Sequence, residues 1–365
     1  MLDIHSLPPA PADKAWWPWV GAVPAPAGQS AASLPTISII TPSYNQGQYL
    51  EETIRSVIAQ NYPNYELIIV DGGSTDATLD VIRRYEPWIT HWVSERDRGQ
   101  SHAIQKGLDR ATGDIVNWVN SDDLVAPGAF RRIAAEFDTE RYDVLCGRCD
   151  YFLNNLSHLA ERGMRMGLGP TVGDTLAWPK INQPSTFFKA AVLRELGIDE
   201  AYRYTMDVDL WYLYLLRTGQ GRVLLSEALL TYFRLHDASK SVAESPGFAG
   251  EVWRVYYNVL ASTGQAAVLL AYARAGVAGA AGFVPTRYAV GVGVHELRAF
   301  VRHVAWRGLL YYNEQGAPGP ARQCLALALR HGQPLRGPVL RQLLKLYLLP
   351  APLARWLART PTPAS

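Results

Sequence analysis

The sequence predicts an α/β fold, with a mostly parallel sheet covered by helices on both faces and a helical region after it. Between residues 36 and 135, short apolar runs alternate with helical patterns, which is typical of βαβ units. The first two runs are continuously apolar, as in strands buried on both faces of a sheet. Beyond residue 245 only helical periodicity remains. We therefore expect a sheet domain over residues 36–245 and a basic helical region over residues 246–365.

The first segment of the chain differs in composition from the rest. Residues 1–35 are rich in Pro and Ala and contain Trp16, Trp17 and Trp19. We expect an extended arm whose aromatic cluster docks on the sheet domain, and a loose tail is the alternative.

The elements of the sheet domain follow one another in a regular order. The expected strands are residues 37–40, 66–70, 90–95 and 114–119, and the expected helices are residues 48–60, 77–85 and 101–111. Because each helix connects two parallel strands, the carboxyl ends of all four strands meet at one edge of the sheet.

Polar side chains follow the first, second and fourth of these strands. They are Thr41, Pro42, Ser43 and Tyr44, then Asp71, then Asn120, Asp122 and Asp123. Ligands of open α/β sheets bind at the carboxyl edge, so we expect these residues to line a crevice. Ordinary turns explain the glycines and helix caps of these loops, but not the gathering of acids at one edge.

Asp122 and Asp123 form an acidic pair at the tip of a buried strand. Such a pair is costly unless a cation meets it. A hard divalent ion that bridges carboxylate and phosphate oxygens would do so, whereas capping the next helix needs only one acid. The pair therefore predicts a Mg²⁺ or Mn²⁺ site.

The cysteines indicate a reducing compartment. Cys146, Cys149 and Cys324 are an odd and sparse set, which argues against a disulfide framework. Cys146 and Cys149 have redox or zinc spacing, but no second pair accompanies them, so buried strand cysteines are the favoured interpretation. The first residues lack the basic flank and apolar stretch of a signal peptide. We expect a cytoplasmic protein.

Charge divides the chain into two regions. Residues 251–365 contain thirteen Lys and Arg, three Glu and no Asp, a net charge of +10, which leaves −8 of the total of +2 for residues 1–250. Arginines between regularly spaced apolar residues predict amphipathic helices with basic faces. No nucleic-acid-binding motif or aromatic stacking platform accompanies them, so nucleic acid is not an expected partner.

Two interpretations of these basic helices stay open. Either they pack to shape the acceptor site or a dimer surface, or they lie on an anionic membrane leaflet. We expect packing for residues 251–330 and a peripheral membrane contribution, at the inner face of the plasma membrane, from the last 30 residues.

Five motifs recur together in one known family. They are TPSYNQGQYLEETIRSVIAQNYPNYELIIVDGGSTDAT, RGQSHAIQKGLDRATGDIVNWVNSDD, QPSTFFKAAVLRELG, MDVDLWYLYL and FRLH. With these motifs the chain closely resembles the family-2 inverting glycosyltransferases, which have the Rossmann-like GT-A fold, over roughly residues 36–240. The resemblance implies transfer of a sugar from a nucleoside diphosphate sugar to a glycan or lipid-linked acceptor, in the synthesis of a bacterial surface polysaccharide.

The resemblance also implies a donor pocket at the polar edge. Its nucleotide-lining residues would be Thr41, Pro42, Ser43 and Tyr44. Asp71 would accept a hydrogen bond from the base, although its position also suits an Asx turn. Asn120 is a further expected donor contact. Lys106 lies near the crevice, where it either pairs with phosphate or belongs to a solvated charge run.

Metal and catalytic roles are implied for four further residues. Asp123 would be the direct metal ligand, with Asp122 nearer the ribose, and His236 would reach the metal or the diphosphate. An attacking acceptor hydroxyl must lose its proton to a carboxylate, and the resemblance gives this role to Asp207. Asp207 and Asp209 both also suit a helix N-cap, and we assign the structural role to Asp209.

The chain departs from the family at two places. Ser121 stands where many members have another Asp, and Ile104 with Gln105 stands where many have Arg-Asn. Contacts between this helix and the donor diphosphate are therefore an open question.

Two other functions are compatible with parts of the pattern. A sugar nucleotidyltransferase also carries acids at strand ends, but it usually opens on a glycine-rich loop with a basic tail, which is missing here. A degenerate GT-A scaffold or assembly subunit has no need to keep all of the acidic and histidine motifs. Glycosyl transfer is therefore the favoured function.

Overall fold

The computed structural model describes residues 6–24, 30–236, 245–277 and 282–348, and it divides the chain into two compact units. The first, called the sheet unit here, comprises Met1–Met166, Lys180–Trp211 and Gly221–Ser245. The second, the helical unit, comprises Gly167–Pro179, Tyr212–Gln220 and Pro246–Ser365. One boundary coincides with the expected division after residue 245, and two internal segments that we had expected in the sheet domain belong to the helical unit.

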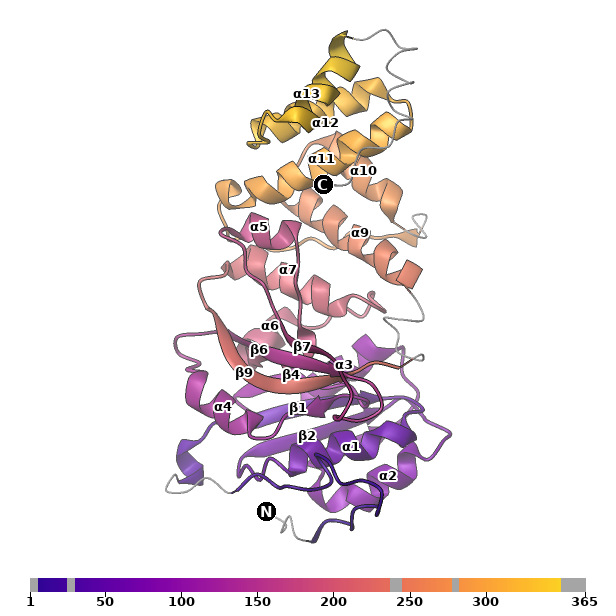
Figure 1. Ribbon diagram of the computed structural model, residues 1–365, viewed down its shortest axis with the longest axis vertical. Coiled ribbons are helices and arrows are strands. Elements are labelled where there is room, and N and C mark those ends of the chain that lie inside the picture. The colour runs from indigo at the N-terminus through magenta and orange to yellow at the C-terminus, as the bar shows by residue number, and fades with distance from the viewer. Residues whose placement is uncertain (1–5, 25–29, 237–244, 278–281, 349–365) are drawn as a thin grey trace. The chain divides into compact units, whose positions relative to one another are not determined.

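The sheet unit is built on one mixed sheet with the strand order β3-β2-β1-β4-β8-β6-β9-β5, and β7 pairs with β6 (Figure 1). The strands are β1 (Ile37–Ser43), β2 (Tyr65–Asp71), β3 (His91–Ser94), β4 (Ile115–Trp118), β5 (Leu124–Val125), β6 (Val144–Phe152), β7 (Leu159–Arg165), β8 (Thr186–Lys189) and β9 (Val223–Arg234). Strands β1 to β4 are parallel, as predicted. Antiparallel pairs join β4 to β8, β8 to β6, and β9 to β5.

Helices cover both faces of this sheet, which confirms the predicted fold class. The helices of the sheet unit are α1 (Gly47–Ile58), α2 (Thr78–Tyr85), α3 (Gln100–Arg110), α4 (Ala129–Glu136) and α6 (Ala190–Leu196). Alternation along β1 separates the faces, because Ile37 and Ile39 pack in one core cluster with Ile54 of α1. Ile40 faces α3 on the other side, so closely that a Cβ on Gly107 would lie 2.3 Å from it.

The amino-terminal arm docks on the sheet unit, as predicted, and is not a loose tail in its described part. Trp17 and Trp19 are buried. The indole of Trp17 donates to the carbonyl oxygen of Val125 at 2.8 Å, and that of Trp19 donates to Glu52 of α1 at 3.0 Å. Buried indoles with satisfied N–H groups are what fixes such a segment in place.

Cys146 and Cys149 are free, buried residues of β6, and Cys324 is buried too. Burial raises the pKa of each thiol to about 12. The interpretation of Cys146 and Cys149 as buried strand cysteines is therefore confirmed.

The helical unit is assembled around aromatic contacts. Its helices are α5 (Val172–Ala177), α9 (Ser245–Ser262), α10 (Ala267–Gly276), α11 (Arg298–Glu314), α12 (Pro318–Arg330), α13 (Gly337–Leu343) and the short π-helix η7 (Leu344–Leu348), while α7 (Met206–Thr218) begins in the sheet unit. The rings of Tyr256 and Phe300 lie 5.3 Å apart, and those of Tyr256 and Trp253 5.5 Å apart. Such contacts join α9 to α11 in a common core.

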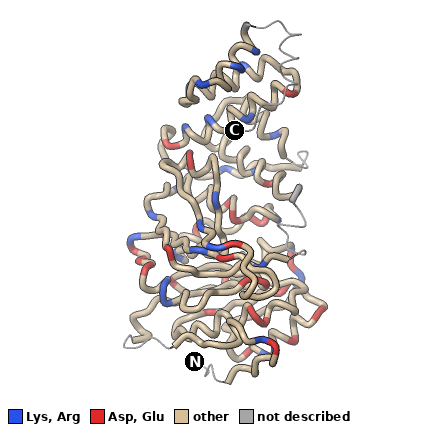
Figure 2. The backbone as a smooth tube through the Cα atoms, viewed as in Figure 1, with Lys and Arg blue, Asp and Glu red and all other residues tan. Residues whose placement is uncertain are grey.

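The described helices of this unit carry many cations and few acids (Figure 2). Among the described residues, none of the helices combines the length and the apolar character that crossing a bilayer requires. Residues 349–365, which belong to the segment expected to contribute the membrane contact, lie outside the described residues.

Candidate active site

The parallel half of the sheet brings the predicted polar residues to one edge. Ser43 at the end of β1 is paired with Asp71 at the end of β2, and Asp71 is paired with Ser94 of β3. On the other side of β1, the amide of Val119 donates to the carbonyl oxygen of Ile40 at 2.9 Å, so Asn120 follows β4 at the same level. Strand pairing alone thus gathers residues from four distant parts of the chain.

Asp71 organises the turn after β2. Its carboxylate is buried and accepts hydrogen bonds from the amides of Gly73 and Ser74 and from the hydroxyls of Ser74 and Ser94. The Asx-turn alternative is therefore present in the structure. The contact between Asp71 and the base stays a prediction. It would add a fifth donor to a carboxylate that already accepts from four protein groups.

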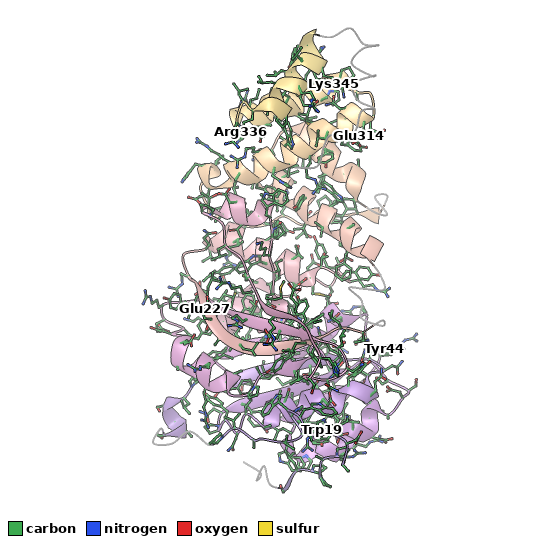
Figure 3. The ribbon with its side chains drawn as sticks, viewed as in Figure 1. Trp19, Tyr44, Glu227, Glu314, Arg336 and Lys345 are labelled. Carbon is green, nitrogen blue, oxygen red and sulfur yellow. The ribbon has the colours of Figure 1, made fainter. Side chains whose placement is uncertain are left out.

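The expected nucleotide pocket has an exposed aromatic ring and two buried hydroxyls. Tyr44 is 62% exposed and is labelled in Figure 3. A Cβ on Gly72 would lie 3.3 Å from its ring and 2.8 Å from Asp97 Oδ2, so a side chain at residue 72 would require the Asp97 side chain to shift. Pro42 is buried beside Val70, while Thr41 Oγ1 and Ser43 Oγ are buried without a hydrogen-bond partner among the described residues. Unsatisfied buried hydroxyls are uncommon and require an explanation such as a ligand.

Asp122 and His236 form the most open part of the acidic site. His236 Nε2 lies 2.9 Å from Asp122 Oδ2, and the two side chains are 12% and 18% exposed. The ring of Tyr49 packs 4.8 Å from the His236 ring. Residues 114 positions apart in sequence are thus brought together at the end of β4 and β9.

Asp123 has a different environment from its neighbour. It is completely buried, and its Oδ1 accepts from the backbone amide of Arg234 at 3.0 Å. Its Oδ2 accepts from Asn120 Nδ2 at 3.2 Å. Burial, and then the neighbouring Asp122 carboxylate, raise the pKa of Asp123 well above its ordinary value. Each oxygen of Asp123 thus has one protein donor, and Asp122 is the more exposed of the two carboxylates; direct ligation of a metal by either one stays a prediction.

Helix α1 holds the backbone of the acidic motif through polar side chains that the sequence analysis did not single out. Thr53 Oγ1 donates to the carbonyl oxygen of Asp123 at 2.8 Å, and Ser56 Oγ accepts from the amide of Val125 at 3.0 Å. Gln60 Nε2 donates to the carbonyl oxygen of Ala126 at 2.9 Å. The available signal was the spacing, because positions 53 and 56 share one face of α1 and Gln60 follows the end of this helix by two residues.

Arg234 was also missed, although it stands in the FRLH motif. Its Nε donates to the carbonyl oxygen of Asp122 at 2.9 Å, and its Nη2 lies 2.6 Å from Glu52 of α1. Its Nη1 donates to the carbonyl oxygen of Asn154 at 3.0 Å. An arginine two residues before the candidate site histidine, at the end of a buried strand, is the signal that could have identified it, because buried arginines need several partners.

Helix α3 connects the acidic motif to the segment before α7. Gln100 Nε2 donates to Asn120 Oδ1 at 2.7 Å, and the next residue, Ser101, donates its hydroxyl to the carbonyl oxygen of Tyr202. Lys106, further along α3, lies 2.7 Å from Glu95. The structure therefore gives Lys106 a partner within the charge run, and a role in phosphate binding stays a prediction.

Asp207 lies in the first turn of α7, five residues after Tyr202. Its side chain is half-buried, whereas that of Asp209 is buried. The partial exposure of Asp207 suits a group that reacts with a ligand, and the burial of Asp209 suits a structural role, but neither role is tested by this geometry.

The residues at this site fit a divalent metal whose coordination shell is completed by phosphate oxygens of a bound nucleotide. The described residues bring no three His, Cys, Asp or Glu side chains together as a metal cage. Asp122 and His236 nevertheless present one carboxylate and one imidazole at a partly open position. Mg²⁺ in nucleotide sites is typically bound by one or two carboxylates plus substrate phosphates, and Mn²⁺ tolerates an imidazole. A cation there would also offset the electrostatic cost of two adjacent carboxylates.

The parallel strands and the polar carboxyl edge define an α/β protein of the GT-A type. Among solved structures, S. aureus TarS 1–349 in complex with UDP-GlcNAc superimposes with a TM-score of 0.51 and 20% identity, over 82% of this chain and 93% of that one. This likeness confirms the predicted GT-A fold.

Sequence comparison identifies a family for part of the sheet unit. The profile of glycosyl transferase family 2 matches residues 38–195, so this segment is similar to the domain of that family. An uncharacterized glycosyltransferase of Rickettsia typhi is 29% identical over 56% of this chain and 65% of that protein. The putative teichuronic acid biosynthesis glycosyltransferase TuaG of Bacillus subtilis is 44% identical over 24% of this chain and 36% of that protein. The chain thus spans only part of the length of the curated relatives it matches.

Proposed function

We propose that the protein is a metal-dependent inverting glycosyltransferase. It transfers a sugar from a nucleoside diphosphate sugar to a glycan or lipid-linked acceptor in the synthesis of a bacterial surface polysaccharide. The observation that carries the proposal is the contact between Asp122 and His236 at the carboxyl edge of a family 2 domain. The name of the relative TuaG, a putative teichuronic acid biosynthesis glycosyltransferase, supports the polysaccharide context.

The donor is held by residues of the polar edge. Thr41, Pro42, Ser43 and Tyr44 form the nucleotide side, where the unpartnered hydroxyls of Thr41 and Ser43 are available to a ligand. Asp71 shapes the turn beneath the base, and Asn120 and Lys106 flank the donor.

Asp122 and His236 are the proposed metal ligands, with Asp123 as the buried support behind them. Mg²⁺ or Mn²⁺ held by these residues would supply positive charge to stabilise the departing diphosphate. Asp122 and His236 fix the position of the diphosphate, and Asp123 orients the motif through its hydrogen bonds to Asn120 and Arg234.

Asp207 is the proposed base. The acceptor hydroxyl attacks the anomeric carbon on the side opposite the leaving diphosphate, and its proton passes to a carboxylate oxygen of Asp207. The product has the inverted anomeric configuration. Holding both substrates in this orientation supplies much of the rate enhancement.

A donor screen tests the function. Purified protein with Mn²⁺ is incubated with a panel of UDP, GDP and dTDP sugars, and products are followed by mass spectrometry and by NMR of the anomeric proton. Turnover of at least one donor, with inversion, is expected. A protein that turns over no donor and binds no nucleotide in calorimetry is a scaffold instead.

We also propose that the carboxyl-terminal part contacts the inner face of the plasma membrane, as a cytoplasmic protein with a lipid-linked acceptor would. On α13 and η7, Leu340, Leu344 and Tyr347 are 50%, 47% and 54% exposed and share one side of the helix. Between residues 298 and 348 there are eight Lys and Arg and one Glu. An apolar stripe among cations complements anionic lipid, and a second copy of the chain is the alternative occupant.

A further inference from the structure

The acidic site is connected to the amino-terminal arm by a chain of buried polar contacts through Arg234 and Glu52. Arg234 is 3% exposed and its guanidinium makes three hydrogen bonds, to the carbonyl oxygens of Asp122 and Asn154 and to Glu52. The same guanidinium lies 4.9 Å from the Tyr49 ring and 4.4 Å from the Phe152 ring. The position of this side chain is therefore fixed on all sides.

Arg234 holds both halves of the proposed metal site. On one side its Nε binds the carbonyl oxygen of Asp122, and its backbone amide binds Asp123. On the other side it lies two residues before His236 on the same chain segment. A displacement of Arg234 therefore moves the Asp122 backbone and the His236 segment relative to each other, and metal ligands depend on such orientation.

Glu52 of α1 is the counter-ion that holds Arg234. The two groups are 2.6 Å apart, with side chains 7% and 4% exposed. Burial alone would raise the pKa of Glu52, but hydrogen bonds from Lys14 and Trp19 and the charge of Arg234 lower it overall. Glu52 therefore stays ionised beside Arg234 at neutral pH.

The remaining partners of Glu52 come from the arm. Lys14 Nζ lies 2.9 Å and Trp19 Nε1 3.0 Å from Glu52 Oε1, while Arg234 uses Oε2. Lys14 also lies 4.5 Å over the Trp19 ring. The arm precedes the segment that matches the family profile, so this part of the network lies outside the matched domain.

We propose that Arg234 is a positioning residue for the metal site, and that Lys14 and Trp19 of the arm act on that site through Glu52. This inference rests on the proposed metal-dependent function. Arm, α1 and β9 thus form one relay, in which the arm fixes Glu52, Glu52 fixes Arg234, and Arg234 fixes the ligands Asp122 and His236.

Mn²⁺ binding to the full chain tests the relay. The free ion is counted by electron paramagnetic resonance during titration with Mn²⁺, alone and with UDP, GDP or dTDP present. Glu52→Gln removes the charge, Trp19→Phe removes the indole N–H donor but keeps an aromatic side chain, and Arg234→Lys keeps a cation but loses the bond from Nε. Glu51→Gln is the matched control, because Glu51 lies on the same helix but contacts Arg84 and Tyr85 and not Arg234.

The relay predicts that Mn²⁺ affinity falls about tenfold or more in Glu52→Gln and Arg234→Lys, as for groups that orient metal ligands. A smaller fall is expected in Trp19→Phe, and none in Glu51→Gln. Melting temperature and near-ultraviolet circular dichroism identify the folded variants. If Glu52→Gln does not fold, Trp19→Phe carries the test, because it keeps an aromatic ring at the position where Lys14 and Arg55 contact the indole.

Two negative results have different meanings. Folded Trp19→Phe and Glu52→Gln proteins that melt at lower temperature but bind Mn²⁺ like the wild type reduce the network to a structural role and overturn the inference. A wild-type protein that binds no Mn²⁺ under any of these conditions overturns the proposed metal site itself, and the relay with it.

Discussion

Asp122 and Asp123 are neighbours in sequence but have opposite environments. Asp122 is partly exposed and touches His236, whereas Asp123 is buried with both oxygens hydrogen-bonded. The sequence predicts a pair of acids at this strand end, but it does not say which one faces the ligand. The orientation of the two side chains depends on the position of β9, because the backbone amide of Arg234 at the end of this strand donates a hydrogen bond to Asp123.

The environment of Asp123 predicts a pH dependence of stability. Because its pKa is raised in the folded protein, protonation of this carboxyl stabilises the fold. The stabilisation is complete below the unfolded pKa of about 4 and is lost as pH rises through the higher folded value. Asp123→Asn imitates the protonated acid at all pH values, so the wild type should gain stability relative to this variant as pH falls from 7 to 5.

Urea unfolding of the metal-free proteins measures this difference. Asp80→Asn is the control, because Asp80 is an exposed acid of α2. If the difference in unfolding free energy between the wild type and Asp123→Asn does not change with pH, the raised pKa assigned to Asp123 is wrong.

Asp207→Asn should lower the rate of sugar transfer by about 100-fold or more while donor binding persists, because a general base contributes to the chemical step. Transfer is measured with the donor identified by the screen, and donor binding by calorimetry. Loss of donor binding in Asp207→Asn would remove Asp207 from the role of base and make it a binding residue.

At the scale of elements, α1 contributes more than a covering helix. Thr53→Val keeps the shape of the side chain but removes the donor to the Asp123 carbonyl oxygen. A buried acceptor left without its partner costs about 1 to 3 kcal/mol, so urea unfolding should show a loss of that size. Thr218→Val at an exposed position serves as control and should change stability by less than about 0.5 kcal/mol. Equal effects of the two substitutions would show that the hydrogen bond to the motif contributes nothing.

The parallel half of the sheet was predictable because its strands are continuously apolar and its helices are amphipathic. The strand expected over residues 37–40 extends to Ser43, which places the polar residues at the strand end itself. The second half was not predicted in detail. Strand β7 is half-exposed to exposed throughout and has no apolar pattern, and the pairings of β6 with β7 and β9 contain register shifts. Local periodicity does not reveal such long-range pairing.

The candidate site was predictable to a similar extent. Motifs identified Asp122, Asp123 and His236, and the structure brings these three residues together. Arg234, Glu52 and Thr53 were missed because their importance comes from contacts between α1, β9 and the loop after β4. A single sequence gives no sign of which buried polar residues meet.

At the scale of the whole molecule, charge divides the chain into an acidic part, residues 1–250, which carries the candidate site, and a basic part, residues 251–365. If the stripe of Leu340, Leu344 and Tyr347 binds lipid, the protein should float with phosphatidylglycerol vesicles and not with phosphatidylcholine vesicles, and less at high salt. Leu340→Ser combined with Leu344→Ser should weaken binding at least about tenfold, because each leucine loses favourable burial.

Leu153→Ser changes an exposed leucine of the sheet unit and should bind vesicles like the wild type. Size-exclusion chromatography of the same proteins separates the alternatives. A dimeric wild type, a monomeric double variant and no vesicle binding by either would identify the stripe as a dimer surface and end the membrane proposal.

The most direct test of the central claim is the effect of Mn²⁺ on nucleotide affinity. Calorimetry measures binding of UDP, GDP and dTDP to the wild type, to Asp122→Asn and to the control Asp80→Asn, with Mn²⁺ or with EDTA. We predict that Mn²⁺ tightens binding of at least one nucleotide by about tenfold or more in the wild type and in Asp80→Asn, and has no effect in Asp122→Asn. Equal affinity with Mn²⁺ and with EDTA in the wild type, or an unchanged Mn²⁺ effect in Asp122→Asn, would contradict the account.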